Sequence, residues 1–314
     1  MRRDATIEIL MATYNGSEYI GEQIESIIQQ TFCDWNLLIS DDGSEDNTLK
    51  IIEEYVKKDD RIKIVSRYGN SGSPKANFMG MIHFARANYI AFADQDDVWE
   101  PNKLELLLRK MKQTEIHVTN DIPLLVFSDL MVVDSTLKEI DKSYFNYMRI
   151  DPYRLRFSQL LVQNTVTGCS CLLNKSLYTL PGISEVDVNN IVMHDWLFAL
   201  LAAIFGRIEY INIPLTNYRQ HGDNSVGALK FNFLSWCHQN SANRQSIEKS
   251  ILQAKELLRV YGHFMPLDRL YTLKTYALIL NEKRINRSII VLKKGYLKSN
   301  LSRKLGQLLF IALL

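Results

Sequence analysis

The feature that most constrains this chain is the regular alternation of short apolar runs with helical patterns over its first 115 residues. Apolar runs occupy residues 7–12, 35–40, 62–66 and 89–93. Apolar residues recur at helical spacing over residues 18–30, 45–57, 75–86 and 101–113. This alternation predicts an α/β fold with a mostly parallel central sheet, in which helices connect consecutive strands.

The rest of the chain is less regular. We expect strands over residues 124–128, 167–173 and 213–218, and a helix over residues 195–205. From about residue 231 the pattern is helical to the end, with breaks expected at 262–266 and at Gly295. We therefore divide the chain into an α/β region, residues 1–227, and a helical region, residues 228–314.

The two regions differ in charge. Residues 228–314 contain 15 Lys and Arg but 4 Asp and Glu, whereas residues 1–227 contain 22 and 31. The net charge of the whole chain is only +2, which argues against a protein-wide basic surface that binds nucleic acid. The tyrosines of the helical region have the spacing of packing residues. We therefore expect no nucleic-acid partner.

The end of the chain combines basic and apolar residues. The basic residues are Lys293, Lys294, Lys298, Arg303 and Lys304, and an apolar run follows at 305–314. This order is typical of a helix that lies in an anionic membrane surface, so residues 293–314 are a candidate peripheral membrane contact. A helix packed on the α/β region and a homodimer interface are the alternatives. No uninterrupted run reaches the roughly 20 apolar residues of a transmembrane helix.

Three carboxylates, Asp94, Asp96 and Asp97, directly follow the apolar run at 89–93. Carboxylates this close repel one another unless they are solvated, cap a helix or hold a cation. Magnesium is usually held by one or two carboxylates together with substrate phosphates. The simpler alternative is the N-terminus of the helix expected from residue 101. The other polar clusters also stand at strand ends, where open α/β sheets bind ligands.

Four short motifs carry a resemblance to a known family. They are Ala12-Thr13-Tyr14-Asn15, Asp41-Asp42-Gly43-Ser44, Asp94-Gln95-Asp96-Asp97 and His194-Asp195-Trp196. In this order they resemble a family 2 glycosyltransferase with the GT-A fold over residues 6–225, and residues 93–99 and 218–222 resemble bacterial rhamnosyltransferases of surface polysaccharides. The resemblance implies a catalytic domain over 1–227, with a nucleotide-binding part at about 1–115 and an acceptor-side part at about 116–227.

The resemblance also implies roles on the donor side. Asp42 would accept the N3 proton of a pyrimidine base, and Thr13 and Tyr14 would line the base or its ribose. Asp94 would contact the ribose or the sugar. Asp96 would coordinate Mg²⁺ or Mn²⁺ on the diphosphate, where the metal offsets the charge of the leaving group.

Further residues complete this expected site. His221 would add to the metal or diphosphate contacts, and Arg219 would help to neutralise phosphate. Asp41 would secure its turn rather than touch substrate, and Asp97 would support the loop or cap a helix. An exposed loop histidine is the simple alternative for His221.

On the acceptor side, Asp195 matches the position of the family's general base. In an inverting transfer this carboxylate removes the proton from the attacking hydroxyl. Gly168, His194 and Trp196 are further acceptor-side candidates. An ordinary acidic residue of a first helical turn is the alternative for Asp195, and a tight strand end is the alternative for Gly168.

The cysteines are few and scattered. They are Cys33, Cys169, Cys171 and Cys237, which fits a reducing cytosol. Cys169 and Cys171 would share one face of a strand, but they would bind zinc only if a second pair of ligands met them. We expect no zinc site.

The resemblance therefore implies a metal-dependent, inverting hexosyltransferase. It would move a sugar, preferably L-rhamnose from dTDP-L-rhamnose, to a sugar hydroxyl of a lipid-linked glycan in capsule or cell-wall synthesis. We expect it in the cytoplasm, at the inner face of the plasma membrane. A UDP-hexose donor and a non-catalytic glycan-binding or scaffold subunit are the alternatives. A nucleotidyltransferase is disfavoured because residues 12–17 lack a glycine-rich, arginine-containing loop, and a processive synthase because no Gln-x-x-Arg-Trp motif is present.

Overall fold

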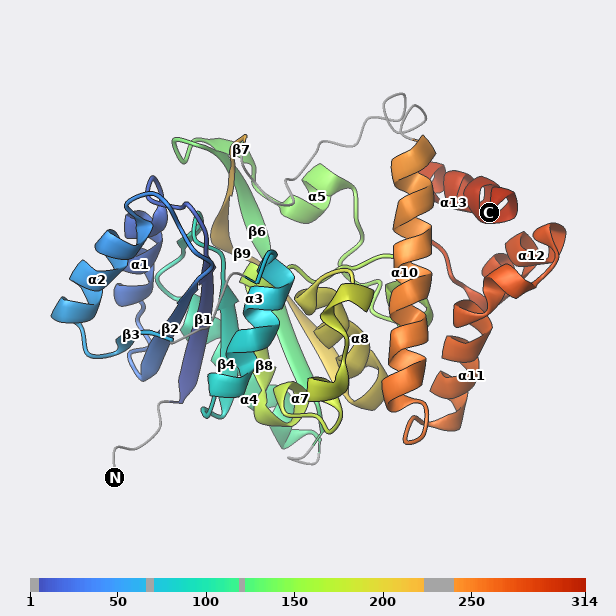
Figure 1. Cartoon of the computed structure of the whole chain (residues 1–314), viewed down its shortest axis with the longest axis horizontal. Coiled ribbons are helices and arrows are strands. Elements are labelled where there is room, and N and C mark those ends of the chain that lie inside the picture. The colour runs from blue at the N-terminus through green and yellow to red at the C-terminus, as the bar shows by residue number, and fades with distance from the viewer. Residues whose placement is uncertain (1–5, 66–70, 119–121, 223–239) are drawn as a thin grey trace.

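The computed structural model describes residues 6–65, 71–118, 122–222 and 240–314 and has one nine-stranded sheet (Figure 1). The strands are β1 (Ile7–Thr13), β2 (Trp35–Asp41), β3 (Ile62–Ile64), β4 (Tyr89–Ala93), β5 (Val98–Trp99), β6 (Leu124–Asp134), β7 (Glu139–Asp141), β8 (Cys171–Asn174) and β9 (Arg207–Gln220). Their order is β3-β2-β1-β4-β8-β6-β9-β5, and β7 pairs with β6.

The first four strands of this order are parallel, as the alternation in the sequence predicts. β6 and β9 are also parallel, and β8 lies antiparallel between β4 and β6. Short helices join the strands: α1 (Ile20–Ile28), α2 (Thr48–Lys58), α3 (Pro74–Met81), α4 (Lys103–Ile116), α5 (Tyr144–Met148), α6 (Phe157–Leu160), α7 (Lys175–Tyr178) and α8 (His194–Phe205). The α/β fold with a parallel core is therefore confirmed.

Two hydrophobic clusters cover the two faces of the sheet. In β1, Ile7, Ile9 and Met11 join the cluster that contains the apolar side chains of α1 and α4. Leu10, between them, belongs to the opposite cluster, which contains those of α3 and α8. Because side chains alternate along a strand, a largely apolar strand such as β1 is buried on both faces.

Two predicted strands differ from the structure in extent. The strand expected over 213–218 is the middle of β9, whose polar, partly exposed first half shows no apolar run. The strand expected over 167–173 begins only at Cys171, because Gly168–Ser170 form a 3-10 turn. Cys169 and Cys171 therefore do not share the face of one strand, and that prediction is wrong.

The helical region packs on the α/β region. Its helices are α10 (Asn240–Tyr261), α11 (Leu267–Ala277), α12 (Arg284–Lys294) and α13 (Leu301–Leu313), so the predicted breaks at 262–266 and Gly295 are confirmed. Ile251, Tyr276, Val291 and Ile311 belong to the same buried cluster as residues of β4 and α8. Within the described ranges, no helix is both long and apolar enough to cross a membrane.

The basic residues at the end of the chain do not form one surface. Lys293 and Lys294 are exposed. Lys298 contacts Ser246 Oγ at 3.4 Å, and burial, followed by the charge of Arg303, lowers its pKa to about 8. Arg303 donates hydrogen bonds to backbone carbonyls next to α5. Much of residues 293–314 therefore packs on the α/β region, as one of the alternatives predicted. Membrane contact and dimerisation through this segment stay predictions.

Candidate active site

The ends of β1 and β2 are tied together by side chains. The parallel register pairs Thr13 with Asp41, and Thr13 Oγ1 donates to Asp41 Oδ2 at 2.8 Å. Asp41 Oδ1 also accepts the N–H groups of Gly43 and Ser44, at 3.1 and 2.8 Å. Gly43 has a φ of +87°, which glycine adopts without strain. The prediction that Asp41 secures the turn is therefore confirmed, and the buried Thr13 hydroxyl takes part in the same turn.

Asp42, the expected acceptor for a base N–H, is held by a residue that the sequence did not reveal. Asp42 Oδ1 accepts the Ser71 N–H at 2.6 Å, and Asp42 Oδ2 accepts the Ser71 hydroxyl at 2.7 Å. Asp42 is only 6 % exposed. A pyrimidine imide would therefore have to share or replace the Ser71 bonds to reach this carboxylate.

The acidic loop is fastened to the tip of β1 by Gln95. Its side-chain amide donates to the Tyr14 carbonyl and accepts the Tyr14 N–H, both at 2.9 Å. A Cβ on Gly16 would lie 2.3 Å from Gln95 Oε1, so a larger residue at position 16 would displace the Gln95 amide from this position. The Tyr14 ring itself is 52 % exposed, which leaves a face free for stacking.

Asp96 and His221 meet because of β5 and β9. These strands pair antiparallel, with Trp99 opposite Thr216, so the residues before β5 lie beside the residues after β9. Asp96 Oδ2 and His221 Nε2 are 2.8 Å apart. Two ligand atoms that each lie about 2.1 Å from one metal ion at right angles are about 3 Å apart. The two side chains form a direct hydrogen bond at this distance, which is also about the spacing of neighbouring ligands of one cation.

Arg219 forms hydrogen bonds with the acidic loop. Its guanidinium is buried, with a side-chain exposure of 2 %, and lies over the Tyr19 ring. Its hydrogen bonds go to the carbonyl of Asp96 at 2.7 Å, the carbonyl of Ser135 at 2.6 Å and the Glu22 carboxylate. The backbone N–H of Arg219 donates to Asp97 Oδ1 at 3.1 Å. The structure thus places Arg219 on the backbone of the loop that carries the carboxylates.

A buried lysine that the sequence did not single out lies under the same loop. Lys103 donates to the Cys169 carbonyl and to Thr216 Oγ1, and its Nζ lies 3.6 Å from the centre of the Trp99 ring. Burial lowers the pKa of Lys103 to about 8, while the nearby charge of Asp97 acts in the opposite direction. No local pattern in the sequence marks this lysine, because its hydrogen-bond partners lie 66 and 113 residues away.

Asp97 and Cys169 are buried close to Asp94. Their candidate ligand atoms and one from Asp94 all lie within 4.8 Å of one another. Burial, and then the charges of Asp96 and Asp94, raise the pKa of Asp97 well above its ordinary value. Cys171, in contrast, donates its thiol to the Gly168 carbonyl. Among the described residues Cys169 and Cys171 form no paired zinc site, and Cys237 lies outside them.

Asp94 links the acidic loop to the start of α8. Burial raises its pKa to about 7, and the charges of Asp96 and Asp195 add to this effect. Such charge effects require that the groups lie near one another in a poorly hydrated space. The contacts agree: Asp195 accepts the N–H of Gly168, and the next residue, Cys169, has its thiol within 4.8 Å of carboxylate oxygens of Asp94 and Asp97. Asp195, which is far from the acidic loop in the sequence, therefore shares one site with it at the carboxyl edge of the sheet.

Asp195 lies in the first turn of α8 and is held by two backbone groups. Its Oδ2 accepts the Gly168 N–H at 3.0 Å, and its Oδ1 accepts the Trp196 N–H at 2.5 Å. Burial raises its pKa to about 6 against the effect of these bonds. A carboxylate with this pKa is ionised at neutral pH and is a stronger base than a free aspartate.

This pKa predicts the pH dependence of the reaction. A proton acceptor must be deprotonated, and the raised pKa means that Asp195 gains its proton at a higher pH than a free aspartate does. We therefore expect the transfer rate to fall about 10-fold per pH unit below about pH 6 and to level off above pH 7. Initial rates between pH 5 and 8 check this, with donor affinity followed in parallel. A rate that stays level down to pH 5 would contradict the assignment.

Gly168 positions Asp195. A Cβ at this position would lie 2.9 Å from His194 Nε2 and 3.6 Å from the Asp195 Cβ. We expect Gly168→Ala to push the His194 ring from its packing and thereby to shift the first turn of α8 with Asp195. The variant should lower kcat at least about 10-fold and cost about 1–3 kcal/mol in the free energy of unfolding. Gly80→Ala in α3 is the control, because its Cβ would meet no atom within 4 Å. Enzyme kinetics and urea denaturation of both variants measure these effects. Equal activities of Gly168→Ala and Gly80→Ala would contradict the role of Gly168 in positioning Asp195.

His194 and Trp196, two acceptor-side candidates, are placed in the core. The His194 ring stacks on Phe78 with centroids 4.1 Å apart and meets the edge of Phe92. Burial lowers the pKa of His194 to about 3, so it is neutral. Trp196 Nε1 donates to the Leu160 carbonyl at 2.6 Å. Both side chains thus anchor the helix that carries Asp195.

The fold and this site together define a class. The sheet is mixed rather than mostly parallel, because β8, β7 and β5 pair antiparallel with their neighbours. It carries an acidic loop after β4, a histidine after β9 and a carboxylate at the start of α8, which is the arrangement of a GT-A nucleotide-sugar glycosyltransferase. The family model "Glycosyl transferase family 2" matches residues 8–178, more than half of the chain. The chain belongs to this family.

Curated relatives agree with this membership. The dTDP-rhamnosyl transferase RfbG of Shigella flexneri is 29 % identical over 69 % of this chain and 74 % of its own length. The Escherichia coli protein WfgD, a UDP-Glc:alpha-D-GlcNAc-diphosphoundecaprenol beta-1,3-glucosyltransferase, is 26 % identical over 88 % of this chain and 94 % of its own. These relatives support a hexosyltransferase of polysaccharide biosynthesis.

Solved structures share the fold. Residues 1–349 of S. aureus TarS in complex with UDP-GlcNAc align with a TM-score of 0.54 and 16 % identity, over 98 % of this chain and 89 % of that one. Against a longer TarS chain the match spans 43 % of its length. The mannosyltransferase PcManGT from Pyrobaculum calidifontis, in complex with GDP-Man and Mn²⁺, aligns with a TM-score of 0.54 and 12 % identity, over 99 % of this chain and 86 % of that one.

Proposed function

We propose that this glycosyltransferase moves a sugar from a nucleoside-diphosphate donor to a hydroxyl of a lipid-linked glycan, with inversion and with the help of a divalent cation. The observation that carries the proposal is the convergence of Asp96, His221 and Asp94 with Asp195 at one edge of the sheet. It supplies a cation site for the leaving diphosphate and, on another element, a base for the incoming hydroxyl.

The residues of the acidic loop fit Mg²⁺ or Mn²⁺. Asp96 of this loop offers a carboxylate oxygen that suits both ions, and His221, after β9, offers an imidazole nitrogen 2.8 Å from it that favours Mn²⁺ over Mg²⁺. We assign these two residues to the cation, which would neutralise charge on the diphosphate when it is bound. Asp94 lies on the sugar side of the loop, towards Asp195. Arg219 holds the loop in position through the Asp96 carbonyl rather than through substrate phosphate.

On the donor side, Tyr14 offers its exposed ring to the base, and Asp42 offers a carboxylate to the imide N–H in place of the Ser71 bonds. The Thr13 hydroxyl stays within the turn and supports both. On the acceptor side, Asp195 takes the proton of the attacking hydroxyl. Gly168 leaves room beside it, and His194 and Trp196 hold its helix in place.

The donor that we favour is dTDP-L-rhamnose, because RfbG is named as a dTDP-rhamnosyl transferase and matches most of this chain. A UDP-hexose is the second candidate, supported by WfgD, whose name also specifies a diphosphoundecaprenol-linked acceptor. We propose the same class of lipid-linked acceptor for this chain. The product would then be a capsule or cell-wall glycan, and the enzyme would act at the inner face of the plasma membrane, where such an acceptor lies.

The experiment is the release of nucleoside diphosphate from dTDP-rhamnose, UDP-sugars and GDP-sugars, with Mg²⁺, with Mn²⁺ or with EDTA, and with lipid extract as acceptor source. We expect cation-dependent release from dTDP-rhamnose. Release of UDP from a UDP-hexose, with no release from dTDP-rhamnose, would contradict rhamnose as the donor sugar and would still agree with cation-dependent sugar transfer. No release from any donor would favour the non-catalytic glycan-binding subunit.

A further inference from the structure

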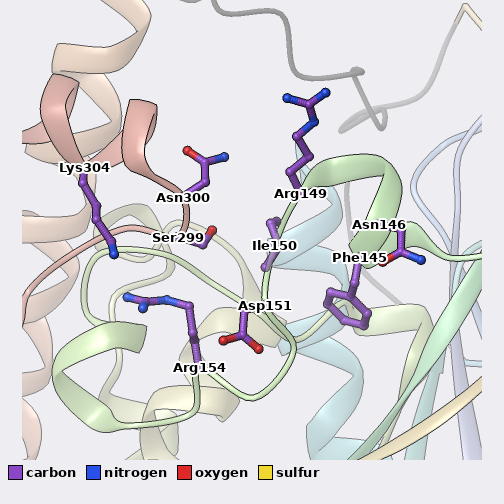
Figure 2. A pocket seen from close by; sticks show the side chains of 9 residues that line it. All are labelled: Phe145, Asn146, Arg149, Ile150, Asp151, Arg154, Ser299, Asn300 and Lys304. Carbon is purple, nitrogen blue, oxygen red and sulfur yellow. The ribbon is translucent and has the colours of Figure 1, made fainter.

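A basic pocket lies where the helical region meets the acceptor-side part of the chain. It has a volume of about 480 Å³ and is bounded by the segment that follows α5 and by the start of α13 (Figure 2). Arg149, Arg154 and Lys304 line it, against one carboxylate, Asp151. The excess of positive charge indicates an anionic ligand.

Two of the cationic side chains, Lys304 and Arg154, come from separate elements and face a common space. Figure 2 shows the amine of Lys304 and the guanidinium of Arg154 pointing into the same region, with Ser299 and Asn300 beside them, while Arg149 stands at the rim. Asp151 is engaged in its own turn, where it accepts the Tyr153 N–H at 3.0 Å. Arg154 also donates to the Leu297 carbonyl, which carries no charge. Asp151 can offset one cation, so the three cationic side chains leave the pocket with a net positive charge.

The N-terminus of α13 adds to this positive potential. The helix begins at Leu301, and the side chain of Asn300 accepts the Arg303 N–H at 3.0 Å. The N-terminal end of a helix carries a partial positive charge that favours phosphate groups. Arg303, one turn into the helix, clamps it to α5 through the carbonyls of Met148 and Arg149, at 2.8 and 3.2 Å.

The pocket lies against α5, a short helix whose first residue contacts β9. Tyr144, the first residue of α5, packs against Tyr218 of β9 with ring centres 5.8 Å apart. The charges of both Asp195 and Arg303 act on its hydroxyl. A ligand in the pocket would thus lie on the acceptor-side part of the chain, at the helix that packs on β9.

A row of exposed leucines continues along α13 from the same end of the helix. Leu301, Leu305, Leu309 and Leu313 are 71 %, 57 %, 57 % and 56 % exposed. They recur every four residues and so share one broad face of the helix. An anion site beside an exposed apolar row is the combination that a phosphorylated lipid needs.

We propose that the pocket of Arg149, Arg154 and Lys304 binds the diphosphate of a lipid-linked acceptor, and that the leucine row of α13 carries the first part of its lipid chain. This assignment rests on the proposed function, since it names how that acceptor is held. It differs from a general membrane contact, because the phosphates enter a defined pocket.

The test is binding of farnesyl diphosphate in EDTA, measured by calorimetry, so that no divalent cation can hold a diphosphate at Asp96. The variant is Arg149→Asn with Lys304→Ala. Asparagine suits position 149, whose φ is +52°, better than alanine does. The control is Lys50→Ala with Lys57→Ala, which removes two exposed charges from α2, on the far side of the molecule (Figure 1). We expect the Kd to rise about 10-fold or more in the variant and to stay unchanged in the control.

Two further probes separate the sources of the phosphate. Inorganic pyrophosphate should bind more weakly than farnesyl diphosphate, and its equally tight binding would overturn the lipid assignment. Vesicles of phosphatidylglycerol that bind wild type but not the variant, with farnesyl diphosphate binding unaffected, would assign the cations to the membrane surface and overturn the proposal. Because these assays need no sugar transfer, their failure is distinct from the absence of nucleoside-diphosphate release.

A kinetic comparison adds a readout that a structural defect would not give. With a short prenyl-diphosphate-linked sugar as acceptor, the variant should show a KM raised about 10-fold. With a benzyl glycoside of the same sugar, which has no phosphate, variant and wild type should be equal. An equal loss with both acceptors would overturn the pocket assignment.

Discussion

Asp195→Asn should lower kcat by about 10²–10⁴-fold while donor affinity changes little. Asparagine keeps the size of the side chain and can still accept the Gly168 N–H, but it cannot take a proton from the acceptor hydroxyl. Single-turnover transfer and equilibrium donor binding, measured on the same preparation, separate the two effects.

The control for this variant is Asp268→Asn. Asp268 is also an acidic residue of a first helical turn, in α11, and its side chain is 72 % exposed. It tests the ordinary alternative for Asp195, in which the carboxylate only stabilises the helix end. That alternative predicts a loss of stability below about 1 kcal/mol and full activity for both variants. Full activity of Asp195→Asn would therefore contradict the assignment of Asp195 as the general base.

Asp96→Ala should lower the transfer rate roughly 10²–10³-fold and abolish its dependence on Mg²⁺ or Mn²⁺. The reason is that alanine leaves His221 without the carboxylate that lies 2.8 Å from its Nε2. Titration of the rate against each cation, with EDTA as the baseline, is the measurement.

Asp60→Ala, which removes an exposed carboxylate after α2, is the control and should keep the wild-type cation response. Thermal unfolding with and without Mn²⁺ gives a second readout, because a bound cation raises Tm by mass action. We expect that rise in wild type and in Asp60→Ala, and its loss in Asp96→Ala. If Asp96→Ala kept the rise in Tm with Mn²⁺, the cation would have to bind at other residues, such as the cluster of Asp94, Asp97 and Cys169.

The basic end of the chain illustrates how the same charges can serve different purposes. In one dimension, Lys298, Arg303 and Lys304 look like one basic segment before an apolar run. In the structure Lys298 is enclosed by packing, Arg303 clamps α13 to α5, and Lys304 lines the pocket. The charge pattern alone could not separate these roles, because each depends on what α13 packs against.

The sequence by itself determined the α/β class, the parallel strands from β3 to β4, and the strand ends that carry Asp42, Asp94 and Asp96. These follow from local periodicity and from the rule that ligands bind at the carboxyl edge of such sheets. Family membership followed from the order of four short motifs, each at or near the end of a strand or the start of a helix.

Only the tertiary structure decided which residues meet. Asp96 meets His221 because β9 returns beside β5, and Asp195 meets the Gly168 N–H because a 3-10 turn replaces the first half of a predicted strand. The roles of Ser71 and Lys103 depend on contacts across 29 and 66 residues, to Asp42 and to Cys169. Such contacts leave no periodic trace in the sequence, since they are set by how distant strands and helices pack rather than by local conformational preference.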